Sequence, residues 1–503
     1  MKKVAMLAFC AVFVASPLWA DRVDDLETKI LQLEQQLQEL KGALEQEKEA
    51  KAPEAAPAKE GMQLVGPGGT LSVGGDIRWR GRFFDNLWDF NSSNDGDQSE
   101  SYRFRPRVWL DWKPTEDSEA YVRFAKEWLM GQDGEMPGYE VDAKDVLFDN
   151  AWFLQKDIFG LPVDIKIGRQ DLVYGEGFVI IDGTPNDGSQ TISFDAAKAT
   201  LKHDWGSTDF LLVKTYENNS SFADDEDFYG IYNKWKLGGF GLEPYLLYRN
   251  KNQGPNISPA AGTAAPGSSS TVDPSPREET VLLGFRGTRE LDLTDGVKLA
   301  LAGEIGKEWG EMDFTGEGPG GWGYSRFAGA NQVDRDAWGG TFNGILTFAD
   351  VMWTPSIKGA FTYTTGDDPT TADYEGWDDF YAQFPKYSEL YIYTLYDGFK
   401  GRSGVNDPDV GAWGNMMIPE VAFTVKPTTK YSQTLRYLYF MADEKNGPGL
   451  GDERGHNLQW LSTYDFSKNL SGHFLAEWFD PGDYYAIGAD DAFFVRFQLL
   501  YQF

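Results

Sequence analysis

The sequence predicts an all-β membrane protein in which about eighteen antiparallel strands close into a barrel. Three observations predict this fold: a strand-like C-terminal end, the lack of a long apolar run after the leader, and connections that alternate between short and long. Residues 492–503 read AFFVRFQLLYQF, which places Phe493 and Phe497 on one face and Arg496 and Gln498 on the other. Such strict alternation indicates a strand with one apolar and one polar face. Taken alone, this segment also fits an edge strand of a soluble sandwich.

Residues 1–20 are typical of a cleaved signal peptide. Two lysines precede the apolar run 4–15, and the expected cut follows Ala20. A lipoprotein would need Cys10, the only cysteine, as its modified residue, but Cys10 lies too early and follows the bulky Phe9. The mature chain is therefore expected to contain no cysteine, which excludes disulfides, thiolate nucleophiles and cysteine-ligated zinc.

A heptad pattern occupies residues 21–51. Its apolar positions alternate spacings of three and four at Val23, Leu26, Ile30, Leu33, Leu37, Leu40 and Leu44. The pattern predicts a short periplasmic coiled-coil helix and hence a homo-oligomer, for which a trimer is attractive by analogy with porins. The alternative is a single amphipathic helix that docks on the barrel or on a periplasmic partner. Residues 52–69, rich in Ala, Pro, Glu and Gly, are expected to form a flexible linker.

Residues 70–503 are expected to form the transmembrane β-barrel. No segment approaches the roughly 18 consecutive apolar residues of a transmembrane helix, whereas about eighteen alternating segments approach the length of a tilted membrane-crossing strand. Aromatic residues make up 15% of the chain, which suits the aromatic girdles of such barrels. The alternating connections indicate short periplasmic turns, long outer loops and two periplasmic termini, so we expect the protein in the outer membrane of a Gram-negative bacterium. A soluble sandwich does not predict this alternation.

Two outer loops are unusual. Residues 252–278 are rich in Pro, Ser, Gly and Ala and are expected to be mobile. Residues 366–415 form a loop long enough to fold inward as a constriction. Acidic residues also gather in the outer loops, among them Asp224, Asp225, Glu226, Asp227, Asp367, Asp368, Asp373, Glu375, Asp378 and Asp379. We interpret them as solvated charge, or as sites that bridge lipopolysaccharide through divalent cations, because none has the spacing of a calcium-binding loop.

The alternation also assigns basic side chains to the barrel lumen. The expected lumen arginines are Arg78, Arg80, Arg82, Arg103, Arg105, Arg107, Arg123, Arg436 and Arg496. On the lipid face at mid-membrane, each arginine would cost about 2–4 kcal/mol. A lumen lined by guanidinium groups selects anions and holds carboxylate or phosphate groups in two-point contacts. The alternative is that these arginines pair with lumen acids and only brace the wall.

The net charge of −32 argues against nucleic acid as a partner.

The sequence gives little support for catalysis. It contains three histidines, His203, His456 and His473, and no Gly-x-Ser-x-Gly motif. His473 is expected to face the lumen near Glu477, but a lone pair of this kind is usually structural. Residues 316–321 satisfy a G-x-G-x-x-G pattern in an outer loop with no following helix, which is no nucleotide site. We therefore expect no catalytic residue, no metal and no cofactor.

Three stretches resemble a known family. They are IGRQDLVYG at 167–175 followed by SFD at 193–195, TGDD at 365–368, and WFDPG at 478–482. Found in this order over most of 70–503, they resemble the alginate-export family of outer-membrane barrels. The resemblance implies an eighteen-stranded barrel with a basic lumen that passes an anionic uronic-acid polysaccharide, with Arg169 helping to hold or shape that lumen. The N-terminal heptad is more reminiscent of phosphate-selective porins.

Taken together, these observations predict an outer-membrane channel whose arginine-lined lumen passes anionic solutes such as the acidic polysaccharide alginate. Two alternatives remain open. The barrel could serve as a sheath or docking scaffold for a periplasmic partner bound through residues 21–51. It could also be a general porin for phosphate and other small anions.

Overall fold

The computed structural model describes residues 62–86, 90, 92–93, 98–130, 146–181, 194–216, 226–251, 277–313, 327, 330–382, 386–391, 413–445, 450–485 and 489–503. The chain divides into two units, Met1–Ala58 and Lys59–Phe503. The expected signal peptide, the coiled coil, most of the linker and nearly all of the loop at 252–278 lie outside the described residues.

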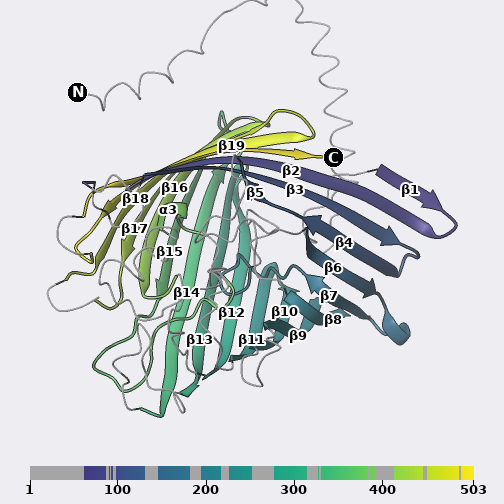
Figure 1. The fold of residues 1–503 in the computed structure, drawn as a ribbon, viewed down its shortest axis with the longest axis horizontal. Coiled ribbons are helices and arrows are strands. Elements are labelled where there is room, and N and C mark those ends of the chain that lie inside the picture. Colours follow the sequence, from purple (N-terminus) through teal and green to yellow (C-terminus); the bar gives the residue numbers. More distant parts are fainter. Residues whose placement is uncertain are drawn as a thin grey trace, which may run out of the picture. The chain divides into compact units, whose positions relative to one another are not determined.

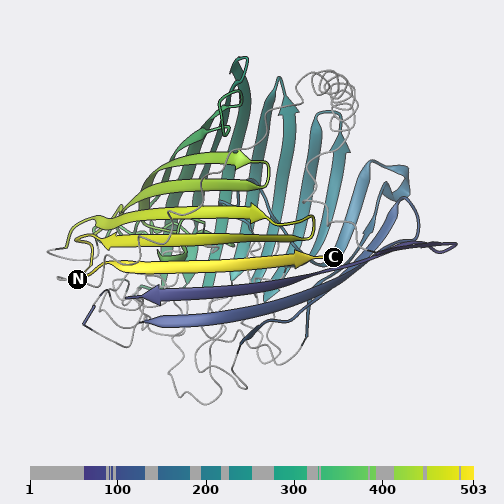
Figure 2. The ribbon, with the colours of Figure 1, turned by 90° about the horizontal axis from the view of Figure 1, so that it is seen from above.

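Eighteen antiparallel strands form a closed ring in the described part of the chain, which confirms the predicted fold class. They are β2 (Gly69–Asp85), β3 (Ser99–Lys113), β4 (Ser118–Ala125), β6 (Leu147–Gln155), β7 (Val163–Gln170), β8 (Phe194–His203), β9 (Gly206–Tyr216), β10 (Glu226–Leu237), β11 (Phe240–Lys251), β12 (Arg277–Thr294), β13 (Val297–Asp313), β14 (Gln332–Phe348), β15 (Ser356–Thr364), β16 (Met416–Thr428), β17 (Tyr431–Met441), β18 (Glu453–Asp465), β19 (Leu470–Pro481) and β20 (Ala492–Gln502). Each strand pairs with the next, and β20 pairs with β2, as Figures 1 and 2 show.

Four further elements accompany the ring. The short strand β1 (Met62–Gly66) folds back on the start of β2, and β5 (Trp128–Leu129) continues β4 beside β3. The turn η2 (Ile158–Gly160) joins β6 to β7, and α3 (Glu389–Tyr391) lies in the loop between β15 and β16. No helix among the described residues is long and apolar enough to cross a membrane.

The last residue of the chain completes the seam of the barrel. The β20–β2 register runs from Phe493 beside Asp85 to Gln502 beside Asp76. Beyond it, the backbone N–H of Phe503 donates to the Gly75 carbonyl (3.0 Å), and the Gly75 N–H donates to the Phe503 carbonyl (2.9 Å). A side chain at Gly75 would collide with the Phe503 ring, so this close approach requires glycine. The C-terminal alternation that suggested a barrel strand thus belongs to the strand that closes the ring.

The connections alternate as the sequence predicted. Short turns join β8 to β9, β10 to β11 and β16 to β17, and each is followed by a longer connection after the next strand. At the β10–β11 turn, Gly238 and Gly239 have φ values of 58° and 78°. Both values suit a two-residue hairpin turn of type I′, which needs positive φ at its two central residues.

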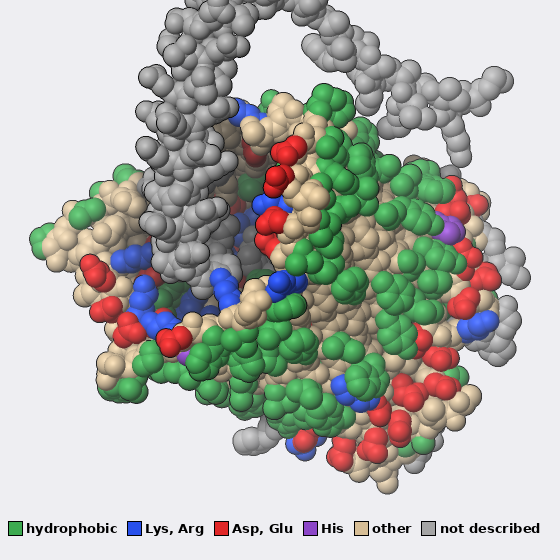
Figure 3. All heavy atoms as spheres, turned by 180° about the vertical axis from the view of Figure 1, so that it is seen from behind, with side chains coloured by type: hydrophobic (Ala, Val, Ile, Leu, Met, Phe, Trp, Pro, Cys, Tyr) green, Lys and Arg blue, Asp and Glu red, His purple; other side chains and the backbone are tan. Residues whose placement is uncertain are grey.

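Alternate residues of the strands form an apolar outer surface. Leu435 on β17 is 52% exposed, and its neighbours Phe423 on β16 and Trp460 on β18 also point outward. Figure 3 shows this apolar surface as a band of hydrophobic side chains on the outer wall, with acidic side chains gathered beyond one edge of the band. The other face of each strand points into the barrel and carries the polar residues described below.

We predict that Leu435→Arg lowers the free energy of unfolding by about 2–4 kcal/mol, because it places a charge on the lipid-facing surface near the middle of β17. The matched control is Thr434→Arg on the same strand, whose side chain faces inward and hydrogen-bonds Thr424 (2.8 Å). Denaturant unfolding in phospholipid vesicles measures both. Equal losses for the two variants would contradict the assignment of the faces.

Candidate lumen site: an arginine wall and an inward loop

Seven arginines on three adjacent strands form one surface of the lumen, which we call the arginine wall. They are Arg78, Arg80 and Arg82 on β2, Arg103, Arg105 and Arg107 on β3, and Arg496 on β20. The strand register brings them into rows, with Arg78 beside Arg105, Arg80 beside Arg103, and Arg82 beside Arg496. Their side chains are largely buried inside the barrel, whereas Val108 and Leu110 on the opposite face of β3 are exposed.

Two carboxylates brace part of the arginine wall. Glu127 contacts Arg78 (3.2 Å) and Arg103 (2.7 Å). Asp76 contacts Arg105 (3.7 Å) and Arg107 (2.7 Å). Each carboxylate is therefore shared between two guanidinium groups. For these four arginines, the alternative that lumen arginines pair with lumen acids and brace the wall is observed. Breaking such a buried pair leaves an uncompensated charge, which costs about 3–5 kcal/mol.

Other arginines of the wall donate to neutral acceptors. Arg80 donates to the Gln498 side-chain oxygen through Nε (2.8 Å) and Nη2 (2.6 Å). Arg82 donates to the Ser101 hydroxyl (3.3 and 3.2 Å). These hydrogen bonds fix the orientation of both guanidinium groups.

Arg123 and Arg436 also face inward, in separate ion-pair clusters. Arg123 on β4 contacts Asp149 (2.6 Å) and Asp171 (3.4 Å). Arg436 on β17 contacts Glu420 (2.7 Å) and donates to the backbone carbonyl of Tyr387 (3.1 Å). Arg123 therefore links β4 to β6 and to the loop after β7, and Arg436 links β17 to β16 and to the long loop.

Arg169 lies outside the lumen, which differs from the position implied by the resemblance. It shares the outward face of β7 with Ile167, and its side chain is 38% exposed. It forms a two-point contact with Asp195 on β8 (2.8 Å for each hydrogen bond). Side chains two residues apart on a strand point to the same face, so Arg169 points outward with the lipid-facing Ile167.

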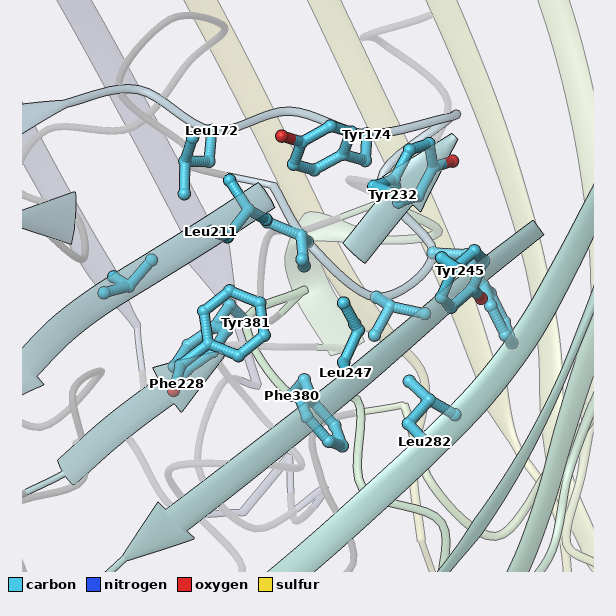
Figure 4. Close-up of a cluster of buried hydrophobic side chains, with 14 of the residues drawn as sticks. Leu172, Tyr174, Leu211, Phe228, Tyr232, Tyr245, Leu247, Leu282, Phe380 and Tyr381 are labelled. Carbon is cyan, nitrogen blue, oxygen red and sulfur yellow. The ribbon is translucent and has the colours of Figure 1, made fainter. Parts of the chain in front are cut away.

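Two loops fold into the barrel and meet there. Residues 171–181 follow β7, and residues 365–382 and 386–391 follow β15; Ile180 and Tyr381 form a parallel bridge between them. Tyr381 donates from its backbone to Val179 (3.0 Å) and from its hydroxyl to Glu226 on β10 (2.6 Å). Figure 4 shows the resulting cluster of buried aromatic and aliphatic side chains against β9 to β12. The described parts of the long loop therefore lie inward, as expected from its length.

Trp377 anchors the long loop against the wall. Its ring is fully buried, stacks on Phe178 (5.5 Å between centroids) and lies against Gly306 on β13 and Gly339 on β14. A Cβ atom at these glycines would come within 2.9 and 2.6 Å of the ring, respectively. The two glycines thus form the recess that receives the tryptophan.

Asp379 is buried in the barrel and the Asp378 side chain is 19% exposed, which corrects the interpretation of these loop acids as solvated charge. Asp378 forms an ion pair with Arg249 on β11 and lies 3.9 Å from Arg335 on β14. Both arginines also contact wall carboxylates, since Arg249 and Arg335 each lie 3.4 Å from Glu278. The loop acid thus joins a mixed network of charges instead of an outer surface.

The other end of the long loop contacts the opposite wall. Ser388 donates from its hydroxyl to Glu477 on β19 (2.6 Å), and the backbone N–H of Glu389 donates to the same carboxylate (3.1 Å). The Glu389 side chain forms an ion pair with Arg496 on β20. In the ring of eighteen strands, β11 is the ninth and β20 the eighteenth. The loop therefore joins diametrically opposed parts of the barrel.

His473 has a structural environment. It accepts a hydrogen bond from Nε of Arg496 through its Nε2 atom (2.9 Å), while the nearby Glu477 binds the loop. No group of three His, Cys, Asp or Glu side chains among the described residues could hold a metal ion. Guanidinium groups such as those of the arginine wall are suited to contacts with carboxylate and phosphate groups.

Sequence reasoning missed Arg249, Arg335 and Glu389. Arg249 follows Tyr245 and Leu247 on the inward face of β11, so that face appears apolar in the sequence. Glu389 belongs to a loop, where strand alternation carries no information. The inward side of β11 is apolar because the two loops pack on it.

Comparison with known proteins found one matching family model and several similar solved structures of low sequence identity. Residues 70–493 match the family model described as alginate export, and a search of the curated proteins found no match. OccK11 (OpdR) of Pseudomonas aeruginosa is 11% identical, with a TM-score of 0.49 and 86% of this chain and 95% of that chain covered. OccD3 (OpdP) of the same organism is 12% identical, with a TM-score of 0.48 and coverage of 90% and 96%. OmpT, an outer membrane protein of Vibrio cholerae, is 12% identical, with a TM-score of 0.38 and coverage of 86% and 97%.

We predict that the inward packing of the long loop weakens as the pH rises from about 4 to about 7. Burial and the adjacent Asp378 carboxylate raise the pKa of Asp379 from 3.8 to about 7. The packed loop therefore favours the protonated acid, and its packing is strongest below the ordinary pKa and is lost as Asp379 ionises. Burial opposes the ionisation of Asp378, but Arg249 and Arg335 outweigh it and lower that pKa.

Hydrogen exchange of the amides at 374–382 measures this effect. After correction for intrinsic rates, protection at pH 5 should exceed protection at pH 8 roughly tenfold or more. Asp379→Asn should keep the protection high at both pH values, because the amide cannot ionise. Equal protection of the unmodified loop at both pH values would contradict the prediction.

Proposed function

The chain belongs to the alginate export family, and on this premise we propose that it is an outer-membrane channel that passes anionic solutes, with alginate-like acidic polysaccharide among them. The observation that carries the proposal is the arginine wall. Its seven guanidinium groups lie on three neighbouring strands, and the carboxylates Asp76 and Glu127 are each shared between two of them. A lumen surface of this kind attracts anions and repels cations.

The geometry of the wall suits a chain that carries repeated carboxylates. Neighbouring strands lie about 4.8 Å apart, and alternate residues along one strand about 6.6 Å apart. Guanidinium groups at these spacings can receive several carboxylates in succession. Conduction also requires that each contact be weak enough to exchange. Arg80 and Arg82 donate to Gln498 and Ser101, and a solute carboxylate can exchange with these acceptors.

The opposite wall of the barrel is less favourable for anions. There Arg249, Arg286 and Arg335 are interleaved with acidic side chains, namely Glu243, Glu278, Glu304 and Glu308. The inward loop adds Asp378 to this side. We therefore expect the path of the anion to follow β2, β3 and β20.

We predict that replacing both Arg80 and Arg82 with Gln lowers the permeability ratio of chloride to potassium roughly twofold or more, because it removes two positive charges from the wall. The reversal potential in a potassium chloride gradient across a planar bilayer measures the ratio. Arg78 and Arg103 are poorer targets, because their loss removes two ion pairs from the buried Glu127.

Arg169→Gln is the control, because it makes the same substitution once on the outward face. It should leave the reversal potential unchanged. Cation preference of the unmodified protein would overturn the proposed function. An unchanged reversal potential in the double variant would show that Arg80 and Arg82 serve only the structure.

A further inference from the structure

A carboxylate of the protein itself lies on the arginine wall. Glu389, in α3 of the long loop, forms an ion pair with Arg496, and the side chains are 6% and 7% exposed, respectively. Arg80 and Arg82 also act electrostatically on Glu389. A loop carboxylate thus takes the place that the proposed function gives to the carboxylate of a solute.

The groups around Glu389 form a built carboxylate site. Nη1 of Arg496 donates to Glu389 Oε1, while Nε of Arg496 donates to His473 (2.9 Å), which fixes the plane of the guanidinium. Gln498 lies two residues after Arg496 on β20. It accepts a hydrogen bond from Arg80, its neighbour on β2. The second carboxylate oxygen, Glu389 Oε2, is buried and has no hydrogen-bond partner among the described residues. A carboxylate is therefore bound here, but only one of its oxygens is satisfied.

The segment that carries Glu389 is held by the burial of Tyr387 and Leu390 in an apolar cluster and by hydrogen bonds. Gln459 donates to the Tyr387 carbonyl (2.6 Å), and Ser388 donates to Glu477 (2.6 Å). Water replaces these hydrogen bonds on release, so their net contribution to holding the segment is small compared with their strength in isolation. The ion pair of Glu389 is the contact that an external anion can replace like for like.

The other charged contact of the loop differs in this respect. Arg249 and Arg335 contact Glu278 and Glu308 from the wall as well as Asp378 from the loop. Loss of Asp378 would leave wall carboxylates beside both arginines. This end of the loop is therefore braced, and an external carboxylate gains less by replacing Asp378 than by replacing Glu389.

We propose that Glu389 is a tethered competitor, which occupies a carboxylate-binding site formed by Arg496 and Arg80 until the carboxylate of a sugar acid replaces it and releases residues 386–391 from β19 and β20. The inference rests on the proposed function and adds to it a substrate group and a means of control. A tethered group acts at an effective concentration of the order of millimolar. A single sugar acid should therefore compete at millimolar concentrations, and a chain with many carboxylates at lower ones.

The first test is the accessibility of the loop. Leu390 is 1% exposed, and Cys10, in the expected signal peptide, is the only natural cysteine. Full-length protein with Leu390→Cys is reconstituted in vesicles and treated with a membrane-impermeant maleimide. Saturating sodium glucuronate should raise the labelling rate about tenfold. Glucose and sodium chloride at matched osmolarity and ionic strength should not.

The second test is competition. Glucuronate should inhibit the chloride current through the channel, and Glu389→Gln should lower the half-inhibiting concentration about tenfold, because the tethered carboxylate no longer competes. The matched control is Asp378→Asn, which removes the other charged contact of the same loop. It should change the half-inhibiting concentration less than about twofold.

The outcomes separate this inference from the proposed function. An anion-selective channel whose Leu390→Cys labelling ignores glucuronate, or whose half-inhibiting concentration is unchanged by Glu389→Gln, would overturn the tethered competitor alone. Equal shifts in Glu389→Gln and Asp378→Asn would also overturn it, because they would indicate general loosening of the loop. Cation preference would overturn the proposed function itself. If Glu389→Gln does not fold, the labelling test still decides, since that variant retains Glu389.

Discussion

The hydrogen-bonded ring of strands is the constraint on which the rest of the structure depends. Backbone groups in hydrocarbon have no water to bind, so the sheet has to close on itself. Here β20 meets β2, and the backbone of Phe503 adds two hydrogen bonds to Gly75 beyond the regular register. Once the ring is closed, each strand has a face toward lipid and a face toward the lumen, and every second residue is committed to the interior. The arginine wall is a direct consequence of that commitment.

The features that follow from this commitment could be predicted from the sequence. Period-two alternation located the strands, and the cost of an arginine in lipid placed Arg80 and Arg105 inside, where the structure has them. The same rule, applied to Arg169, would have placed it outside with Ile167. The expectation that Arg169 shapes the lumen came from resemblance, and the local geometry of β7 does not support it.

The contents of the lumen could not be predicted in this way. Alternation assumes that the inward face is polar, yet Tyr245 and Leu247 point inward because residues 171–181 and 374–382 pack against them. These contacts join residues far apart in the sequence, and a loop sequence does not specify which wall it will meet. For the same reason Asp378 appeared to be a surface charge, whereas burial beside Arg249 makes it part of an interior network.

The sharing of carboxylates explains how one surface can be both rigid and basic. Like charges on adjacent strands repel, and a one-to-one pairing would remove both the repulsion and the positive charge of the surface. Glu127 lies between Arg78 and Arg103, and Asp76 lies between Arg105 and Arg107, so each carboxylate orients two guanidinium groups and neutralises one charge. At Arg496, the long loop supplies the carboxylate of Glu389. A carboxylate on a loop can move away from the wall more easily than one on the barrel wall, and this difference separates the braced part of the wall from the part that our proposal assigns to a solute.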